Sequence, residues 1–118
     1  MTRLPVPLDV SVLKSYSDGD VALENELLEQ FLESTRADVD ALHAALGSGD
    51  LDELGRAAHR VKGSSRMIGA EPQGLAAEHV EHAARGGDAA GAKAAVPALE
   101  AEHARLVEWL RERLGPAA

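Results

Sequence analysis

Apolar residues recur at intervals of three and four along most of this chain of 118 residues. The clearest case lies between residues 20 and 46, where one helical face would carry Leu28, Phe31, Thr35, Val39, Leu42 and Leu46. This spacing is typical of an amphipathic α-helix, whereas the side chains of a strand alternate with a period of two. The chain is therefore expected to bury its apolar residues by packing helices against one another.

Four short clusters containing glycine divide the chain into helical segments. They are SDGD (17–20), GSGD (47–50), GAEPQG (69–74) and GGD (86–88). In each cluster a glycine can end one helix before the next begins, which predicts helices at about 8–16, 20–46, 50–68, 72–85 and 89–114. Because short connections make consecutive helices antiparallel, the predicted fold class is all-α. The expected architecture is an antiparallel up-down four-helix bundle with a short additional N-terminal helix, in a single domain over residues 1–118.

One proline interrupts this helical pattern. Pro97 falls inside the last predicted helix, and a proline there removes a backbone hydrogen bond. We expect it to kink the helix or to mark where the regular helix begins.

The composition narrows the range of partners and sites. The net charge of -8 disfavours nucleic acids and anionic membranes, which attract basic surfaces. The chain has no cysteine, which excludes disulfides and thiolate metal sites. It has no apolar run near the roughly 18–20 residues of a membrane span and no signal segment, so we expect a soluble cytoplasmic protein.

The segment HRVKGSSRMIGA, residues 59–70, places a histidine in unusual surroundings. A helix turns about 100° per residue, so His59 would lie about 140° from the centre of the apolar face and point into solvent. Its neighbours one turn away on the helix surface are two glycines, Gly55 and Gly63, and two cations, Arg56 and Lys62. A third cation, Arg66, lies two turns on.

The two glycines beside His59 need an explanation, because each costs about 1 kcal/mol relative to alanine inside a helix. Bare backbone would let another protein approach the imidazole, and the cations would screen a phosphoryl group with close to two negative charges. The arrangement favours covalent phosphoryl transfer through His59. On the residues alone, a second interpretation stays open. His59 would then be a surface histidine without a role, and the glycines would serve close packing of helices.

The segment AAHRVKGSSRMIGA, residues 57–70, resembles the core motif of histidine phosphotransfer (HPt) domains of two-component phosphorelays. That motif reads approximately A-H-x-L-K-G-S-S/A-x-x-L/I-G-A. The resemblance implies the HPt four-helix bundle, with His59 as the phosphoacceptor and Lys62 as the lysine that neutralises the phosphoryl group. It also implies that Gly63 lets a receiver domain approach and that Ser64 is a small position beside it.

Combining the motif with the helical geometry gives a fuller predicted site. Arg56 and Arg66 would be secondary phosphoryl-stabilising cations, and the predicted receiver-docking positions are Gly55, Gly63 and Ser64. The docking surface is expected to be apolar and to include part of the helix at 20–46.

The resemblance also implies partners. HPt domains have no kinase activity of their own and relay a phosphoryl group between receiver-domain aspartates. The implied partners are response-regulator receiver domains and a hybrid histidine kinase, and the implied state is a monomer. No cofactor is expected in this chain, because the receiver supplies Mg²⁺. A free protein and the cytoplasmic C-terminal domain of a membrane sensor kinase both fit.

Two other functions remain possible at this point. The first is a helical module that binds a receiver or kinase domain without taking the phosphoryl group. The second is a metal-binding bundle that uses His79, His82 and His103, since two histidines at i and i+3 can share a metal. His103 lies in an apolar stripe, where a core-edge histidine with a hydrogen-bond partner is the better expectation.

Overall fold

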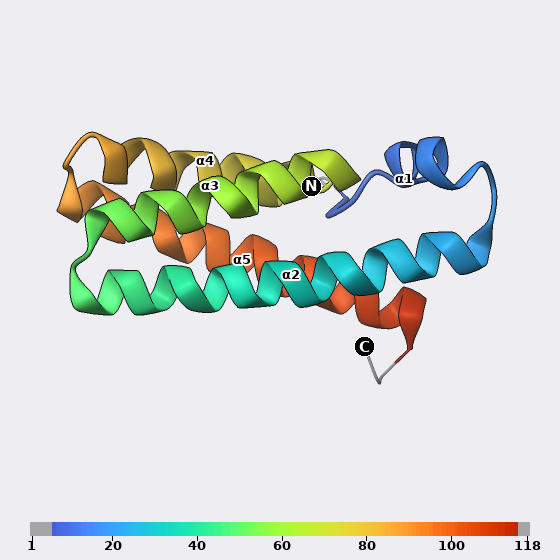
Figure 1. Ribbon diagram of the computed structural model, residues 1–118. Coiled ribbons are helices and arrows are strands. Elements are labelled where there is room, and N and C mark those ends of the chain that lie inside the picture. Colours follow the sequence, from blue (N-terminus) through green and yellow to red (C-terminus); the bar gives the residue numbers. More distant parts are fainter. Residues whose placement is uncertain (1–5, 116–118) are drawn as a thin grey trace, which may run out of the picture.

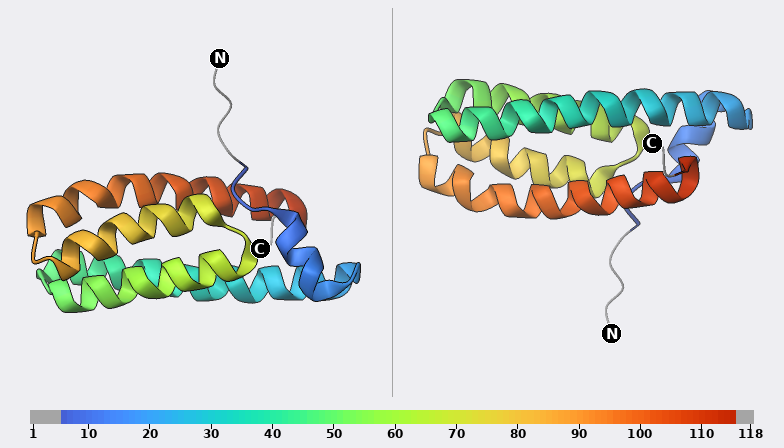
Figure 2. Two further views of the ribbon diagram at one scale, coloured as in Figure 1. Left: turned by 90° about the horizontal axis from the view of Figure 1, so that it is seen from above. Right: turned by 90° about the horizontal axis from the view of Figure 1, so that it is seen from below.

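The computed structural model describes residues 6–115, and these residues form five helices and no strand. The helices are α1 (Val10–Ser17), α2 (Val21–Ser48), α3 (Leu51–Ile68), α4 (Glu71–Arg85) and α5 (Ala89–Leu114). Helices α2 to α5 alternate in direction and form a four-helix bundle, while α1 lies at one end of it (Figures 1 and 2). The predicted fold class is confirmed, and each helix end lies within two residues of its expected position.

Aspartates begin most of these helices. The side chains of Asp9, Asp20, Asp50 and Asp88 each accept a hydrogen bond from a backbone N–H in the first turn of α1, α2, α3 and α5. Such caps satisfy donors that have no partner inside the helix. The helix boundaries are therefore set locally, by residues that the sequence shows directly.

The turn between α3 and α4 requires a glycine. Gly69 has a φ of 88°, and a Cβ built on it would lie 2.8 Å from the backbone oxygen of Asp9. The backbone N–H of Asp9 donates to the Gly69 carbonyl at 2.9 Å, which joins the start of α1 to this turn. Tyr16 adds a second link, because its hydroxyl donates to the Met67 carbonyl at 2.9 Å.

Helix α5 continues through Pro97. It runs without interruption from Ala89, so the expectation that the regular helix begins near the proline is wrong. Pro97 lies on the exposed side of the helix. Proline has no backbone N–H to donate to the Lys93 carbonyl, but water can hydrogen-bond to that carbonyl instead. None of the helices in the described part of the chain is long and apolar enough to cross a bilayer.

The core consists of two hydrophobic clusters. One is centred on residues such as Leu42, Leu54, Val61, Val80 and Leu99, and the other on residues such as Leu13, Leu28, Phe31, Leu106 and Leu110. Trp109 is partly buried and packs at the edge of the second cluster.

A polar layer inside the bundle separates the two clusters, and each of the four long helices contributes one residue to it. The side-chain amide of Gln73 donates to the Thr35 hydroxyl at 3.0 Å and to the Ser65 hydroxyl at 2.9 Å, and its oxygen accepts from His103 Nδ1 at 2.9 Å. Burial, reinforced by the charge of Arg36, lowers the pKa of His103 below its ordinary value. A neutral imidazole with its proton on Nδ1 completes the network, which joins all four long helices in one register.

We expect Gln73→Leu to lower the free energy of unfolding by about 1–3 kcal/mol, because three polar groups lose their partner inside the bundle. Urea denaturation would measure the change. Gln30→Leu, at an exposed position of α2, should change the stability by no more than about 0.5 kcal/mol. Equal stability of Gln73→Leu and the wild type would show that the network makes no net contribution to folding.

Candidate functional site

His59 lies on α3 with its side chain 57% exposed. Its surface position agrees with the helical geometry, because the face centred on Leu54, Ala58 and Val61 is buried in the core. The histidine is nevertheless not isolated. Its Nδ1 atom lies 2.7 Å from Oε2 of Glu81, which comes from the neighbouring helix α4.

Glu81 is the centre of a small ionic cluster. Its side chain is only 8% exposed, and it contacts two cations in addition to His59. Lys62 Nζ lies 2.5 Å from Oε1, and Arg85 Nη2 lies 3.0 Å from Oε2. A buried carboxylate needs partners of this kind, because desolvation otherwise disfavours its charge.

The cluster fixes which nitrogen of His59 faces solvent. Burial acts to raise the pKa of Glu81, but hydrogen bonds from Lys62 and His59 outweigh it and hold the pKa below its ordinary value. An ionised carboxylate can only accept, so Nδ1 of His59 must carry the proton that it donates. The lone pair of a neutral imidazole is then on Nε2, the ring nitrogen not bonded to Glu81.

The two expected secondary cations lie in other ion pairs. Arg56 Nε lies 3.1 Å from a Glu53 oxygen on the same helix. Arg66 lies 3.1 Å from Glu78 and 3.5 Å from Glu71. Both arginines are on α3, but neither shares the carboxylate that binds His59.

The two glycines beside His59 have different surroundings. Gly63 is exposed, and a Cβ built on it would meet nothing within 4 Å. Gly55 is buried, and its Cβ would lie 3.4 Å from Arg85 Cγ and 3.7 Å from Ala84 Cβ. The prediction that Gly55 offers bare backbone to a partner is therefore wrong, because the close approach of α4 covers it.

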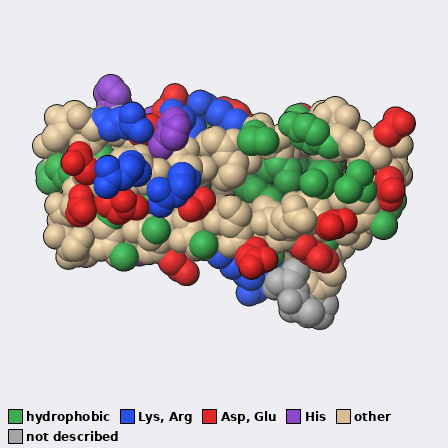
Figure 3. All heavy atoms as spheres, viewed as in Figure 1, with side chains coloured by type: hydrophobic (Ala, Val, Ile, Leu, Met, Phe, Trp, Pro, Cys, Tyr) green, Lys and Arg blue, Asp and Glu red, His purple; other side chains and the backbone are tan. Residues whose placement is uncertain are grey.

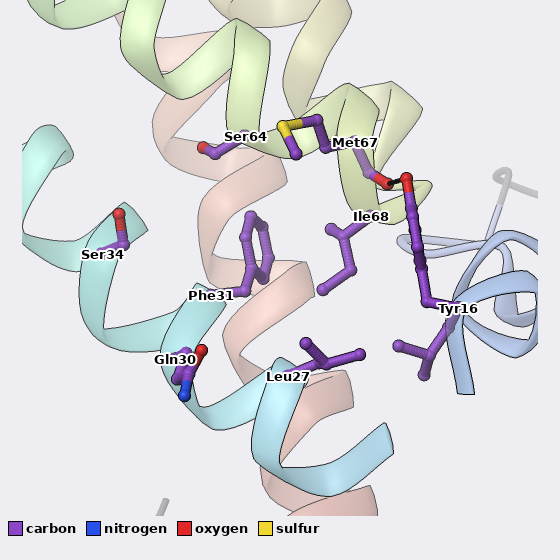
Figure 4. Close-up of a pocket in the computed structure, with 9 residues that line it drawn as sticks. Tyr16, Leu27, Gln30, Phe31, Ser34, Ser64, Met67 and Ile68 are labelled. Carbon is purple, nitrogen blue, oxygen red and sulfur yellow. Dashed lines mark hydrogen bonds between the residues drawn. The ribbon is translucent and has the colours of Figure 1, made fainter. Parts of the chain in front are cut away.

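An apolar groove lies beyond Gly63. It has a volume of about 350 Å³ and is formed by α1, α2 and the end of α3 (Figure 4). Its lining includes Leu13, Tyr16, Leu27, Phe31, Ser64, Met67 and Ile68. In Figure 3 a hydrophobic surface over these elements adjoins an area where histidine, lysine and arginine side chains gather.

One line of exposed residues joins the histidine to this groove. His59, Gly63 and Met67 are spaced four apart on α3 and are all exposed. A partner that covers the groove can therefore reach the imidazole across bare backbone. Ser64 borders the groove, and its hydroxyl donates to the Arg60 carbonyl at 3.0 Å.

Comparison with known proteins identifies the family. The family model described as the Hpt domain matches residues 26–109, which is more than half of the chain. The chain belongs to the Hpt domain family. Its function is histidine phosphotransfer in a two-component phosphorelay, and Hpt domains relay phosphoryl groups with receiver domains.

A solved structure supports the same assignment. Histidine-containing phosphotransfer protein B (HptB) from Pseudomonas aeruginosa PAO1 has a TM-score of 0.82 and 31% sequence identity to this chain. The match covers 91% of this chain and 94% of HptB. Among curated proteins, no sequence matches the chain significantly.

The other histidines of this Hpt domain do not form a metal site. Among residues 6–115, no three histidine or acidic side chains gather closely enough to hold a metal ion. His79 and His82 are exposed on α4, while His103 is bonded to Gln73 inside the bundle. The expectation of a core-edge histidine with a hydrogen-bond partner is confirmed for His103.

The sequence interpretation missed Glu81 and Arg85 as members of the histidine cluster. Both lie on α4, beyond the motif that surrounds His59. One signal could have found them: His59 and Glu81 are equally far from Ala70 along the chain, as are Gly55 and Arg85. In an antiparallel helix pair with a tight turn, positions equidistant from the turn lie side by side.

Proposed function

We propose that His59 is the phosphoacceptor of this Hpt domain. The observation that supports this most directly is the hydrogen bond of its Nδ1 to Glu81, which leaves Nε2 as the available nucleophile. Lys62 lies in the same cluster and is the residue expected to neutralise the incoming phosphoryl group.

The transfer step follows from this geometry. The lone pair of His59 Nε2 attacks the phosphorus of a receiver aspartyl phosphate, and the bond from phosphorus to the aspartate oxygen breaks. Its electron pair leaves with the aspartate carboxylate, while the Nε2–P bond forms. The proton on Nδ1 stays there, and the carboxylate of Glu81 stabilises the positive charge that develops on the ring. The reverse step returns the phosphoryl group to a second receiver.

The apolar groove is the proposed docking surface for the receiver. It combines exposed side chains of Tyr16 and Met67 with the partly buried Leu27, and it lies next to Gly63. Exposed apolar surface of this kind often marks a site of protein association. Burial of the groove would orient the receiver so that its aspartyl phosphate faces His59.

Several features of this proposal rest on the family resemblance. We expect the Hpt domain to act as a monomer, to exchange its phosphoryl group with a hybrid histidine kinase, and to use Mg²⁺ held by the receiver. The expected cytoplasmic location also stays a prediction.

The experiment that tests this function uses a panel of receiver domains carrying aspartyl phosphate, mixed with the wild-type protein. Two-dimensional NMR that correlates ³¹P and ¹⁵N signals would identify the phosphorylated nitrogen, which we expect to be Nε2 of His59. Binding of a receiver without any labelling would replace this proposal with the non-catalytic interaction module.

We expect Gly63→Ala to stabilise the fold and to slow transfer from the receiver. The new methyl group meets no neighbour, and alanine is favoured over glycine in a helix by about 0.5–1 kcal/mol. The same methyl group lies between His59 and the groove, where crowding of ~1 kcal/mol would slow transfer about fivefold. Stopped-flow transfer assays and urea denaturation measure the two effects.

Gly47→Ala is the matched control for this variant. Gly47 is an exposed helical glycine on α2 whose Cβ would also meet nothing within 4 Å. It should leave the transfer rate unchanged. A Gly63→Ala protein that transfers as fast as the wild type would remove the steric role from Gly63.

A further inference from the structure

Arg85 is a cation of the histidine cluster that the family motif around His59 does not contain. It lies at the end of α4, and its guanidinium binds the same Glu81 oxygen that His59 Nδ1 binds. Its aliphatic stem crosses α3 over Gly55, where Cγ would be 3.4 Å from a Cβ on that glycine. Gly55 therefore provides the room through which Arg85 reaches the cluster.

The charges of the cluster change when a phosphoryl group arrives. In the free domain, Lys62 and Arg85 together compensate the carboxylate of Glu81. A phosphoryl group on Nε2 brings close to two further negative charges. Lys62 is then required by the phosphoryl group, and Glu81 would lose an ion-pair partner while it remains buried.

The two arginines of α3 that were expected to stabilise the phosphoryl group form ion pairs outside the histidine cluster. Arg56 pairs with Glu53, and Arg66 pairs with Glu78 and Glu71. Arg85 lies one turn after Glu81 on α4 and already contacts its carboxylate. It can therefore hold that carboxylate without any rearrangement of the backbone.

We propose that Arg85 is a positioning residue for phosphoryl transfer. It keeps Glu81 ion-paired and directed at Nδ1 of His59, which frees Lys62 to bind the phosphoryl group. This inference rests on the proposed role of His59 as the phosphoacceptor. It adds no covalent step, because Arg85 acts through Glu81 alone.

The test compares Arg85→Gln with Arg85→Lys and with Arg111→Gln. Arg111 is exposed on α5, so its substitution removes the same charge away from the cluster. Phosphoryl loading of His59 is measured both from a phosphorylated receiver and from phosphoramidate, a small donor that needs no docking surface. We expect Arg85→Gln to load about two- to fivefold more slowly with both donors, the range for a partly exposed ion pair. Arg85→Lys should retain most of the rate.

A second pair of variants decides whether Arg85 acts through Glu81. In a Glu81→Gln background, Arg85→Gln should cause no further loss, because the charge that Arg85 compensates is gone. An equal loss in both backgrounds would mean that Arg85 contacts the phosphoryl group or the receiver directly, and would overturn the inference. So would a rate for Arg85→Gln that equals that of Arg111→Gln.

Failure of the inference differs from failure of the proposed function. If the wild type loads His59 but Arg85→Gln matches its control, the inference alone is wrong. If the wild type takes no phosphoryl group from either donor, the role of His59 is wrong and the inference falls with it.

Discussion

His59→Gln is expected to fold like the wild type and to accept no phosphoryl group from any receiver. Glutamine has no ring nitrogen that could act as the nucleophile, so the loss should be complete rather than partial. The side chain at this position is 57% exposed, and a glutamine amide can still donate to Glu81. We therefore expect a change of no more than about 1 kcal/mol in the free energy of unfolding.

The measurement is transfer of ³²P from a phosphorylated receiver, with circular dichroism to confirm the fold. His43→Gln is the matched control, because His43 is an exposed histidine on α2 and should be dispensable. A His59→Gln protein labelled at the wild-type rate would exclude His59 as the acceptor.

Glu81→Ala is expected to slow phosphoryl loading of His59 by about 10- to 100-fold. The estimate corresponds to the loss of a charge-assisted hydrogen bond of about 1.5–3 kcal/mol in the transfer step. Without the carboxylate, the proton of His59 is no longer held on Nδ1, and Lys62 and Arg85 face each other without the anion between them. Glu81→Gln should lose less, because its amide oxygen can still accept from Nδ1.

Single-turnover loading from phosphoramidate would measure this effect without a contribution from receiver docking. Nitrogen NMR of the free protein should also show a larger share of the tautomer with its proton on Nε2. Glu100→Ala, on the exposed side of α5, removes one carboxylate at a distance from the cluster and should change neither result. Unchanged loading in Glu81→Ala would show that the hydrogen bond seen here has no part in the reaction.

His59→Gln and Glu81→Ala change the two ends of one hydrogen bond, yet only His59 was evident from the sequence. His59, Lys62 and Gly63 lie within two turns of one helix, where backbone hydrogen bonds fix the relative directions of side chains. Their closeness on the helix surface followed from spacing, and the family motif gave each a role. Glu81 and Arg85 lie on the next helix, and their place depends on how α3 and α4 pack.

The two glycines near His59 show the same division. Gly55 and Gly63 are equivalent neighbours of the histidine on an isolated helix, one turn before it and one turn after it. In the bundle α4 covers Gly55 and leaves Gly63 open. Arg66 likewise finds its partners, Glu71 and Glu78, on α4, whereas Arg56 pairs with Glu53 on its own helix.

The sequence by itself determined the helices, their caps and turns, the all-α bundle and the motif around His59, because each depends on residues close together in the chain. The tertiary structure decided the rotation and register of the helices, which result from packing two apolar clusters around the buried layer of Gln73. That packing placed the carboxylate of Glu81 under His59, placed Arg85 across Gly55, and formed the apolar groove from three helices. Contacts between helices depend on how the whole core packs, which the sequence of a single helix does not specify.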